Sequence, residues 1–353
     1  MSLFSLKNEP KDVELANPPT DGISSLAWSP AGPGDFLAVG SWSNEVRIYE
    51  VREGGANEGR AAYTHEAPVL CCTWSKDGSK IVSGGADNAA RLFDTTTGQT
   101  TQFGAHDAPV RCIEWVDAGS ASGIVCTGSW DKTFRYWDLR QPSPIAQVQL
   151  PERCYTMSCV YPLLVVGTAG CHIQVFNLTN PTVPFKSLTS PLRMQTRALS
   201  CFPDATGFAL SSMEGRVAIQ HVDDSKSNQN FSFKTCRNDL KPLPGPPFRA
   251  GSTSVYSVNA LSFHPFGTFV TAGANGGMNI WDHYSRTRLK NFPTAGGPIS
   301  ATGFSQNGKY LAYAVSYDWS KGHSGNVSTL PNKVLLHACQ EDEVKRRDPS
   351  KKK

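Results

Sequence analysis

The chain repeats a short pattern at a nearly constant spacing, and this repeat limits the fold more than any other feature. A small residue is followed nine positions later by the residue that ends an apolar, strand-like run. The pattern occurs six times, in the pairs Gly40/Tyr49, Gly84/Phe93, Gly128/Trp137, Gly167/Phe176, Ser211/Gln220 and Ala272/Trp281. A period near 40 to 45 residues with short apolar runs predicts similar all-β units that stack into one domain.

A second series marks the same units, because an aromatic residue ends the first apolar run in most of them. These residues are Trp28, Trp74, Trp115, Phe202, Phe263 and Phe304. One further unit, with the run 155–160, has no such aromatic. The unit at 105–138 combines Ala105-His106, Gly128-Ser129 and Trp137-Asp138, which resembles the consensus of the WD40 repeat. The sequence therefore predicts an all-β, seven-bladed WD40 β-propeller.

The ends of the chain are expected to close this ring. Residues 1–340 are interpreted as one propeller domain, and 341–353 as a basic, solvated C-terminal tail. The blades are placed near 21–63, 64–107, 108–149, 150–192, 193–250, 251–294 and 295–340. Blade seven offers three strands of its own, so the segment 12–15 is predicted to supply the fourth and remove an exposed edge. The alternating segment Asn230–Arg237 is predicted as the outer strand of blade five.

Composition argues against several classes of protein. The ten cysteines are scattered without a C-x₂-C pair, which favours reduced thiols and a cytosolic or nuclear location. The sequence contains no apolar run of 18 residues that would span a membrane, and its first residues lack the apolar region of a signal peptide. A phosphate loop, an H-E-x-x-H motif and a metal-spaced Cys/His cluster are absent from the sequence, so we expect no cofactor, no metal and no enzymatic activity.

One polar set in the third unit has two interpretations. His106, Ser129, Asp131 and Trp137 match a hydrogen-bonded tetrad that links the turn before a blade to the strands of that blade. A histidine, a serine and an aspartate also form the triad of hydrolases, but the G-x-S-x-G nucleophile elbow is absent from the sequence. We therefore expect a structural tetrad and no catalytic site.

Several longer motifs resemble those of the WD40 nuclear mRNA export factor family. They are Lys11-Asp12-Val13-Glu14, Gly40-Ser41-Trp42, 74–80, 207–210, 214–219, Phe263-His264-Pro265, Trp281-Asp282 and the stretch Ser316–His323. The last of these lies outside the WD consensus and is the most specific. Together the motifs extend over most of the chain.

The resemblance implies a non-enzymatic adaptor at the nuclear pore complex. Members of this family bind the GLEBS segment of an FG-nucleoporin, a short acidic peptide, and help mRNA leave the nucleus. It implies a protein of the nucleus and nuclear envelope that shuttles to the cytoplasm, with a ring that is monomeric apart from its partner. A propeller of the spindle checkpoint also binds GLEBS-type segments, but it looks less similar because it lacks a counterpart to Ser316–His323.

Two tryptophans mark one face of the predicted ring. Trp42 and Trp130 occupy matching turns between the second and third strands of blades one and three. Tryptophan is enriched where interfaces carry most of their binding energy. The alternative is that each ring packs on the neighbouring blade. If the first interpretation holds, these residues form the peptide-binding face.

A second candidate surface combines aromatic and basic residues. Arg286, Arg288 and Lys290 alternate in a predicted outer strand of blade six, and the outer strand of blade five offers Phe231, Phe233, Lys234 and Arg237. Stacking surfaces with nearby cations suit single-stranded nucleic acid. The resemblance implies that Phe233, Trp281, Asp282, Arg286 and Arg288 belong to a groove that takes nucleic acid or protein mimics of it. An ordinary polar rim remains the alternative.

A shorter motif suggests a different role. The residues Trp137-Asp138-Leu139-Arg140 form a W-D-x-R box. This box resembles the docking signal of WD40 substrate receptors for a cullin-RING ubiquitin ligase. Because the fold itself requires Trp-Asp at this place, the box is a weak indication of a ligase adaptor as partner.

Overall fold

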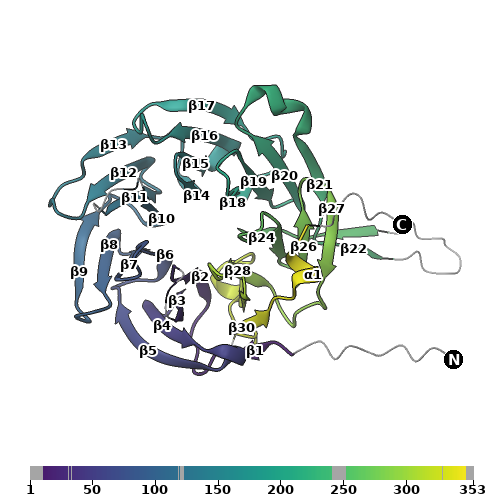
Figure 1. The fold of residues 1–353 in the computed structure, drawn as a ribbon, viewed down its shortest axis with the longest axis horizontal. Coiled ribbons are helices and arrows are strands. Elements are labelled where there is room, and N and C mark those ends of the chain that lie inside the picture. Colours follow the sequence, from purple (N-terminus) through teal and green to yellow (C-terminus); the bar gives the residue numbers. More distant parts are fainter. Residues whose placement is uncertain are drawn as a thin grey trace, which may run out of the picture.

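The strands form a closed ring of radial sheets around a central channel (Figure 1). The computed structural model describes residues 11–30, 32, 34–117, 119, 123–240, 252–327 and 329–346. Within these ranges there are seven four-stranded antiparallel sheets, each with its first strand at the channel and its fourth at the rim. This confirms the prediction of an all-β, seven-bladed propeller.

Each of the first six blades is built from four strands that follow one another in the chain. Blades one to three comprise β2–β5 (Ile23–Trp28, Asp35–Ser41, Glu45–Val51, Asn57–Thr64), β6–β9 (Val69–Trp74, Lys80–Gly85, Ala89–Asp94, Thr100–Ala105) and β10–β13 (Val110–Val116, Ile124–Ser129, Thr133–Asp138, Ala146–Gln149). Blades four to six comprise β14–β17 (Cys154–Val160, Leu163–Thr168, His172–Asn177, Pro184–Thr189), β18–β21 (Thr196–Cys201, Gly207–Ser212, Arg216–His221, Phe231–Lys234) and β24–β27 (Val258–Phe263, Phe269–Gly273, Met278–Asp282, Thr287–Asn291). Short 3-10 helices lie between strands at Glu53–Gly55, Ala169–Cys171, Asp224–Gln229 and His323–Gly325.

Blade seven joins the two ends of the chain. Its strands β28 (Ile299–Phe304), β29 (Tyr310–Val315) and β30 (Lys333–Ala338) are completed by β1 (Val13–Glu14). The pairing is antiparallel, with Val13 opposite Leu336. Leu15 follows β1 and is 2% exposed within a cluster shared by blades seven and one. The predicted closure by the N-terminal strand is therefore confirmed.

The small residues of the repeat are explained by the approach of the next blade. A Cβ atom added to Gly84 in β7 would lie 2.5 Å from a methyl group of Val110, the first residue of β10. The same change at Gly128 in β11 would bring Cβ to 2.6 Å from the sulfur of Cys154 in β14. These distances are shorter than van der Waals contact, so packing between blades selects glycine at both positions.

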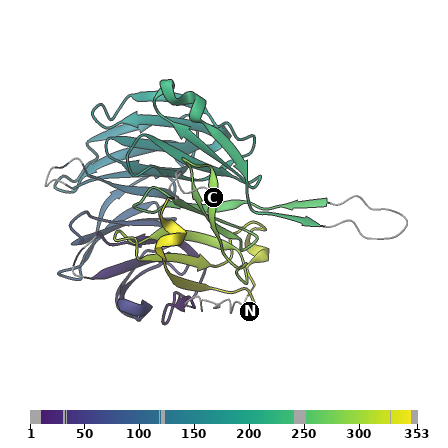
Figure 2. The same ribbon diagram turned by 45° about the vertical axis from the view of Figure 1, so that its right-hand side comes forward.

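The outer strand of blade five is shorter than the sequence predicted. β21 ends at Lys234, and Cys236 has a left-handed backbone with φ of 49°. This conformation interrupts the extended chain, so the expectation of one strand over Asn230–Arg237 is wrong. Arg237 instead begins β22 (Arg237–Leu240), which pairs with β23 (Ser252–Val255) in a hairpin that projects from the ring (Figure 2).

The C-terminal segment is folded further than expected. Residues 341–346 were assigned to a solvated tail, but helix α1 (Glu341–Val344) packs against β27 and buries Val344 to 3% exposure. A capping box between Gln340 and Glu343 begins this helix, and the Thr268 hydroxyl donates a hydrogen bond to the Val344 carbonyl at 2.7 Å. The basic residues at 347–353 lie outside the described residues.

Two further expectations concern the cysteines and the membrane. All ten cysteines are free thiols, and seven of them are buried. Among the described residues, no helix has the length and apolar character needed to cross a membrane.

Candidate functional site

The polar set of blade three forms a chain of hydrogen bonds, with one member different from the prediction. The His106 ring donates from Nδ1 to the Asp131 carboxylate at 2.8 Å, and its Nε2 lies 2.7 Å from the Thr127 hydroxyl. The Trp137 indole N–H donates to that same hydroxyl at 2.7 Å. Thr127, two residues before the predicted Ser129, therefore joins His106 to Trp137.

The expected role of Ser129 in this chain is wrong because its hydroxyl points to the preceding turn. It donates to the Ala108 carbonyl at 3.0 Å and accepts from the Asp131 backbone N–H at 3.0 Å. Residues two apart in a strand share a face, but Ser129 ends β11, where the chain already turns. His106 and Thr127 are buried, and the Thr127 hydroxyl is shared with the Trp137 indole, so the set has the form of a structural tetrad.

Burial decides the charge of this histidine. Desolvation lowers the pKa of His106 more than the nearby Asp131 carboxylate raises it. The ring is neutral at pH 7, which leaves Nε2 free to accept from Thr127. Blade two repeats the arrangement with His65, Asp87 and Ser83, so the network belongs to the repeat and marks no unique site.

The face of the ring that carries the turns between second and third strands is called the upper face. In each blade, the residue after the second strand donates its backbone N–H to the turn before the first strand, as Trp42 does to Gly22 and Trp130 to Pro109. Trp42 and Trp130 therefore occupy equivalent places, as the sequence indicated. Met213 occupies the same place in blade five.

The two tryptophans differ in exposure. Trp130 is 37% exposed, whereas Trp42 is half-buried and stacks on Trp319 with ring centroids 4.0 Å apart. Trp319 lies in the Ser316–His323 stretch of blade seven, so Trp42 packs on its neighbouring blade. Two methionines at blade five, Met194 and Met213, are each 50% exposed on the same face. Neither was predicted from the sequence, although Ser211-Ser212-Met213 repeats the pattern of Gly128-Ser129-Trp130.

The Ser316–His323 stretch is held firmly on the upper face. Tyr317 is 8% exposed and its hydroxyl donates to the Gly322 carbonyl at 2.9 Å, while Asp318 accepts from the Asn259 amide at 3.2 Å. Trp319 has a left-handed φ of 59°, and its buried indole nitrogen has no partner among the described residues. Backbone strain and an unsatisfied polar atom are often retained where a surface has a function.

Two arginines meet at the upper mouth of the central channel. Arg111 and Arg197 are the second residues of β10 and β18, and both line the channel, which has a volume of about 690 Å³. The channel wall and the charge of Arg111 lower the pKa of Arg197. Two arginines at one mouth of the channel attract an anion. No sequence pattern singled them out, because their proximity depends on closing the ring.

The basic and aromatic surface lies at the side of the ring, between blades five and six. The Phe233 and Trp281 rings lie 4.5 Å apart, and the Arg286 guanidinium lies over the Phe231 ring at 4.6 Å. A neighbouring cavity of about 470 Å³, the side groove, is lined by Lys234, Trp281 and Arg288 among others. Three of the seven predicted residues thus reach the groove. Phe231, Phe233 and Arg286 pack together along the blade junction, outside the lining of the groove.

Two expectations about this surface are wrong. Asp282 is 2% exposed and accepts hydrogen bonds from the Tyr284 backbone and the Ser285 hydroxyl, so it stabilises a turn and does not face the groove. Arg286, Arg288 and Lys290 do not share one face, because a bulge pairs Arg288 with Trp281 and Lys290 with Ile280. Lys290 lies 3.0 Å from the buried Glu343 carboxylate.

The W-D-x-R box exposes one of its side chains. Trp137 is 4% exposed in the tetrad, whereas the Arg140 side chain is 72% exposed. Hydrogen bonds from Arg140 lower the pKa of Asp138 to about 2. In the part of the chain that the structure describes, no group of three His, Cys, Asp or Glu residues has the geometry to hold a metal ion.

Comparison with known proteins identifies similar chains. The family model "WD domain, G-beta repeat" matches residues 14–50, 60–94, 98–138 and 248–282. The chain is 51% identical over 338 residues to the Poly(A)+ RNA export protein of Schizosaccharomyces pombe, covering 96% of this chain and 93% of the relative. It is 48% identical to the mRNA export factor GLE2 of Chaetomium thermophilum, over 100% of this chain and 96% of the relative. It is 41% identical to the protein Rae1 of Drosophila melanogaster, over 96% and 97% of the two chains.

Proposed function

The chain belongs to the family of WD40-repeat mRNA export factors, and we propose that it is a non-enzymatic adaptor that binds the GLEBS segment of an FG-nucleoporin at the nuclear pore during mRNA export. The names of relatives that match along nearly the whole chain support the export role. The location in the nucleus and at the nuclear envelope follows from that role.

The observation that carries the choice of surface is the pair of arginines at the upper channel mouth. An acidic peptide needs cations for its carboxylates and apolar area for its remaining side chains. Arg111 and Arg197 supply the first, and Trp130, Met194 and Met213 supply exposed apolar surface on the same face. The upper face meets both requirements.

A binding titration with an isolated GLEBS peptide tests this proposal. Trp130→Ala is expected to weaken binding by about 2 kcal/mol, roughly 30-fold, because a half-exposed aromatic becomes buried on binding. The melting temperature should stay unchanged. Phe185→Ala is the matched control, since Phe185 is 57% exposed on the outer strand of blade four, away from the upper face.

Trp42→Ala is expected to weaken binding as well, but with a lower melting temperature, because it removes the stack on Trp319. Arg111→Glu combined with Arg197→Glu should abolish binding of the acidic peptide. Full-strength binding by both the Trp130 variant and the double arginine variant would contradict the upper face as the site.

A second candidate function is the binding of single-stranded RNA in the side groove. Trp281 offers a stacking surface there, with Lys234 and Arg288 beside it. Lys234→Glu with Arg288→Glu should remove two phosphate contacts and reduce the slope of log affinity against log salt by about 1.4. Lys76→Glu with Lys309→Glu changes the net charge equally at a distant place. An equal effect in both pairs would indicate non-specific attraction and rule out the groove.

The ligase-adaptor alternative rests on the exposed Arg140. If it holds, the chain co-purifies with the adaptor of a cullin-RING ligase, and Arg140→Ala abolishes that association while binding of the GLEBS peptide is retained.

A further inference from the structure

One level of the channel wall is occupied by seven structurally equivalent residues. In every blade the pairing of the first strand with the second strand shifts by one residue near the second residue of the first strand. The fifth residue of the first strand is therefore at an equivalent position in all seven blades. These residues all line the channel, and they are Ala27, Thr73, Glu114, Ser158, Ser200, Ser262 and Gly303. Six are small or carry a hydroxyl group, and blade three alone places a carboxyl group there.

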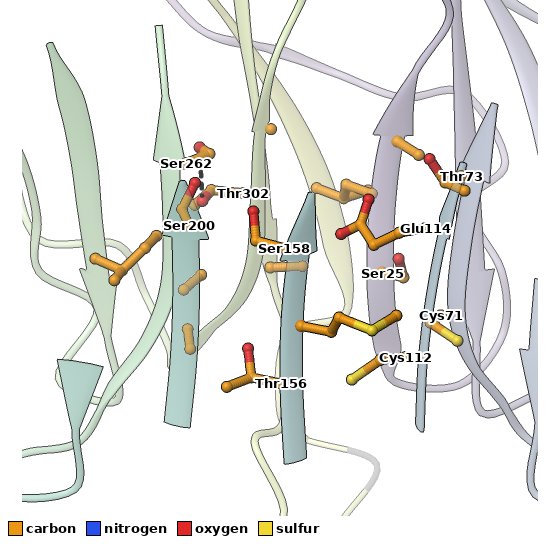
Figure 3. Close-up of a pocket in the computed structure, with 18 of the residues that line it drawn as sticks. Ser25, Cys71, Thr73, Cys112, Glu114, Thr156, Ser158, Ser200, Ser262 and Thr302 are labelled. Carbon is orange, nitrogen blue, oxygen red and sulfur yellow. Dashed lines mark hydrogen bonds between the residues drawn. The ribbon is translucent and has the colours of Figure 1, made fainter. Parts of the chain in front are cut away.

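Glu114 is the only acidic residue among the described residues that line the channel. Its side chain projects from β10, between the strands that carry Thr73 and Ser158 (Figure 3). No described residue forms a hydrogen bond or an ion pair with its carboxyl group. The side chain is half-buried in the channel wall, and a carboxylate in such a place is costly to a fold unless water, a ligand or a proton compensates its charge.

At pH 7 the surroundings keep this group mostly protonated. Burial, with a smaller contribution from Cys112, raises the pKa of Glu114 to about 8. The other thiols that face it are Cys126, Cys159 and Cys201, and burial raises the pKa of each of them. A hydrogen bond with Cys154 lowers the pKa of Cys112, so Cys112 is the second group to control in a titration.

The two ends of the channel differ in charge. Arg111 and Arg197 stand at the upper mouth and repel cations that approach from that side. At the lower end the lining includes Val160, Pro203 and Pro265, which carry no charge. A cation with an apolar stem can therefore enter from the lower face, with its stem against these apolar side chains.

We propose that the lower half of the channel binds a primary ammonium group on an aliphatic stem, with Glu114 as the counter-ion and neighbouring hydroxyl groups as further acceptors. An ammonium group has three N–H donors, and Glu114, Thr73 and Ser158 offer three acceptors from adjacent blades at one level. The ligand is either a free alkyl amine or diamine, or a lysine side chain of a protein.

Binding releases a proton, and this gives the site a measurable signature. The neutral carboxyl group of Glu114 loses its proton to solvent as the ammonium ion enters, and a carboxylate–ammonium pair remains. Affinity should therefore rise about tenfold for each pH unit up to about pH 8, and level off above it.

Calorimetric titration of the full chain with butylamine and 1,5-diaminopentane tests the proposal. Repeating it at pH 7 in buffers of different ionisation heat should show nearly one proton released for each amine bound. Glu114→Gln should weaken binding by tenfold or more and abolish the proton release. Cys112→Ser should leave both unchanged.

The same titration with a short lysine peptide distinguishes the two sources, because the tighter ligand indicates whether a free amine or a lysine side chain is the natural occupant. Should E114Q fold poorly, Glu114→Ser installs the hydroxyl group that blades four to six already carry. Binding that is absent at pH 9, independent of pH, or unchanged in both Glu114 variants would overturn the proposal.

Discussion

Two buried histidines, one in blade three and one at the closure of the ring, lie beside carboxylates, yet one is neutral and the other is charged. His106 contacts a single carboxylate, and desolvation lowers its pKa, so the ring is neutral. His337 in β30 lies between two carboxylates, with Nδ1 2.7 Å from Asp12 and Nε2 2.9 Å from Glu343. Burial acts to lower its pKa, but the two acids raise it to about 9, so this ring is an imidazolium.

The difference follows from where the partners come from in the chain. His106, Thr127, Asp131 and Trp137 lie within one repeat, and blade two forms a similar set. At the closure, Asp12 precedes β1, Glu343 belongs to α1, and Lys290 from blade six adds an ion pair to Glu343. The tetrad strengthens one blade, whereas the His337 network ties both chain ends to two blades.

Among the changes that test this comparison, removing the N-terminal strand should lower the free energy of unfolding most. Deletion of residues 1–17 removes Asp12, uncovers β30 and exposes the site of Leu15. Loss of a buried apolar side chain and of one partner in a buried ion network should cost about 3 kcal/mol or more of unfolding free energy. Urea denaturation of the full chain and the truncated chain measures it, and an unchanged melting temperature would show that β1 does not close the ring.

Substitutions in the tetrad should have an intermediate effect. Thr127→Val keeps the side-chain shape but leaves His106 and Trp137 without their shared partner, at a cost of about 2–3 kcal/mol. Ser129→Ala should cost about 1 kcal/mol, because Ser129 only caps a turn. Chemical denaturation of both variants measures the two losses of unfolding free energy. A larger loss for Ser129→Ala would restore the membership predicted from the sequence.

The pH dependence should give the smallest effect and the sharpest contrast. The folded pKa of His337 lies above its ordinary value, so its contribution is complete below about pH 6.5 and is lost as pH rises through about 9. The difference in unfolding free energy between the wild type and His337→Gln should shrink by about 1–3 kcal/mol across that window. Glu114 titrates in both proteins, so its contribution cancels in the difference between the wild type and His337→Gln.

His106 should show the opposite sign. Its folded pKa is lowered, so its contribution is present above about pH 6.5 and is lost as pH falls. The comparison of wild type with His106→Gln, measured by denaturation between pH 5 and 9, checks this. Curves of the same sign for both histidines would refute the contrast between a neutral and a charged ring.

The fold could be predicted from the sequence to a large extent, because every blade needs the same residue types at the same positions. Gly84 and Gly128 are small since the next blade touches them, and this constraint is readable without coordinates. The candidate surfaces were predicted less completely. The positions of Trp130 on the upper face and of Trp281 at the side groove follow from the repeat, but the burial of Asp282 depends on a turn and the orientation of Lys290 depends on a bulge.

The propeller, the number of blades and the closure by the N-terminal strand can be predicted without coordinates, because strand period, turn residues and inter-blade packing are encoded within each unit of about 40 residues. Which side chains come together across blades depends on the closed ring. Trp42 stacks on Trp319, Arg111 lies near enough to Arg197 to lower its pKa, and Glu114 shares a level of the channel with small and hydroxyl-bearing residues. These neighbours are far apart in the chain, so their contacts and charges are set by closing the ring, and no local pattern records them.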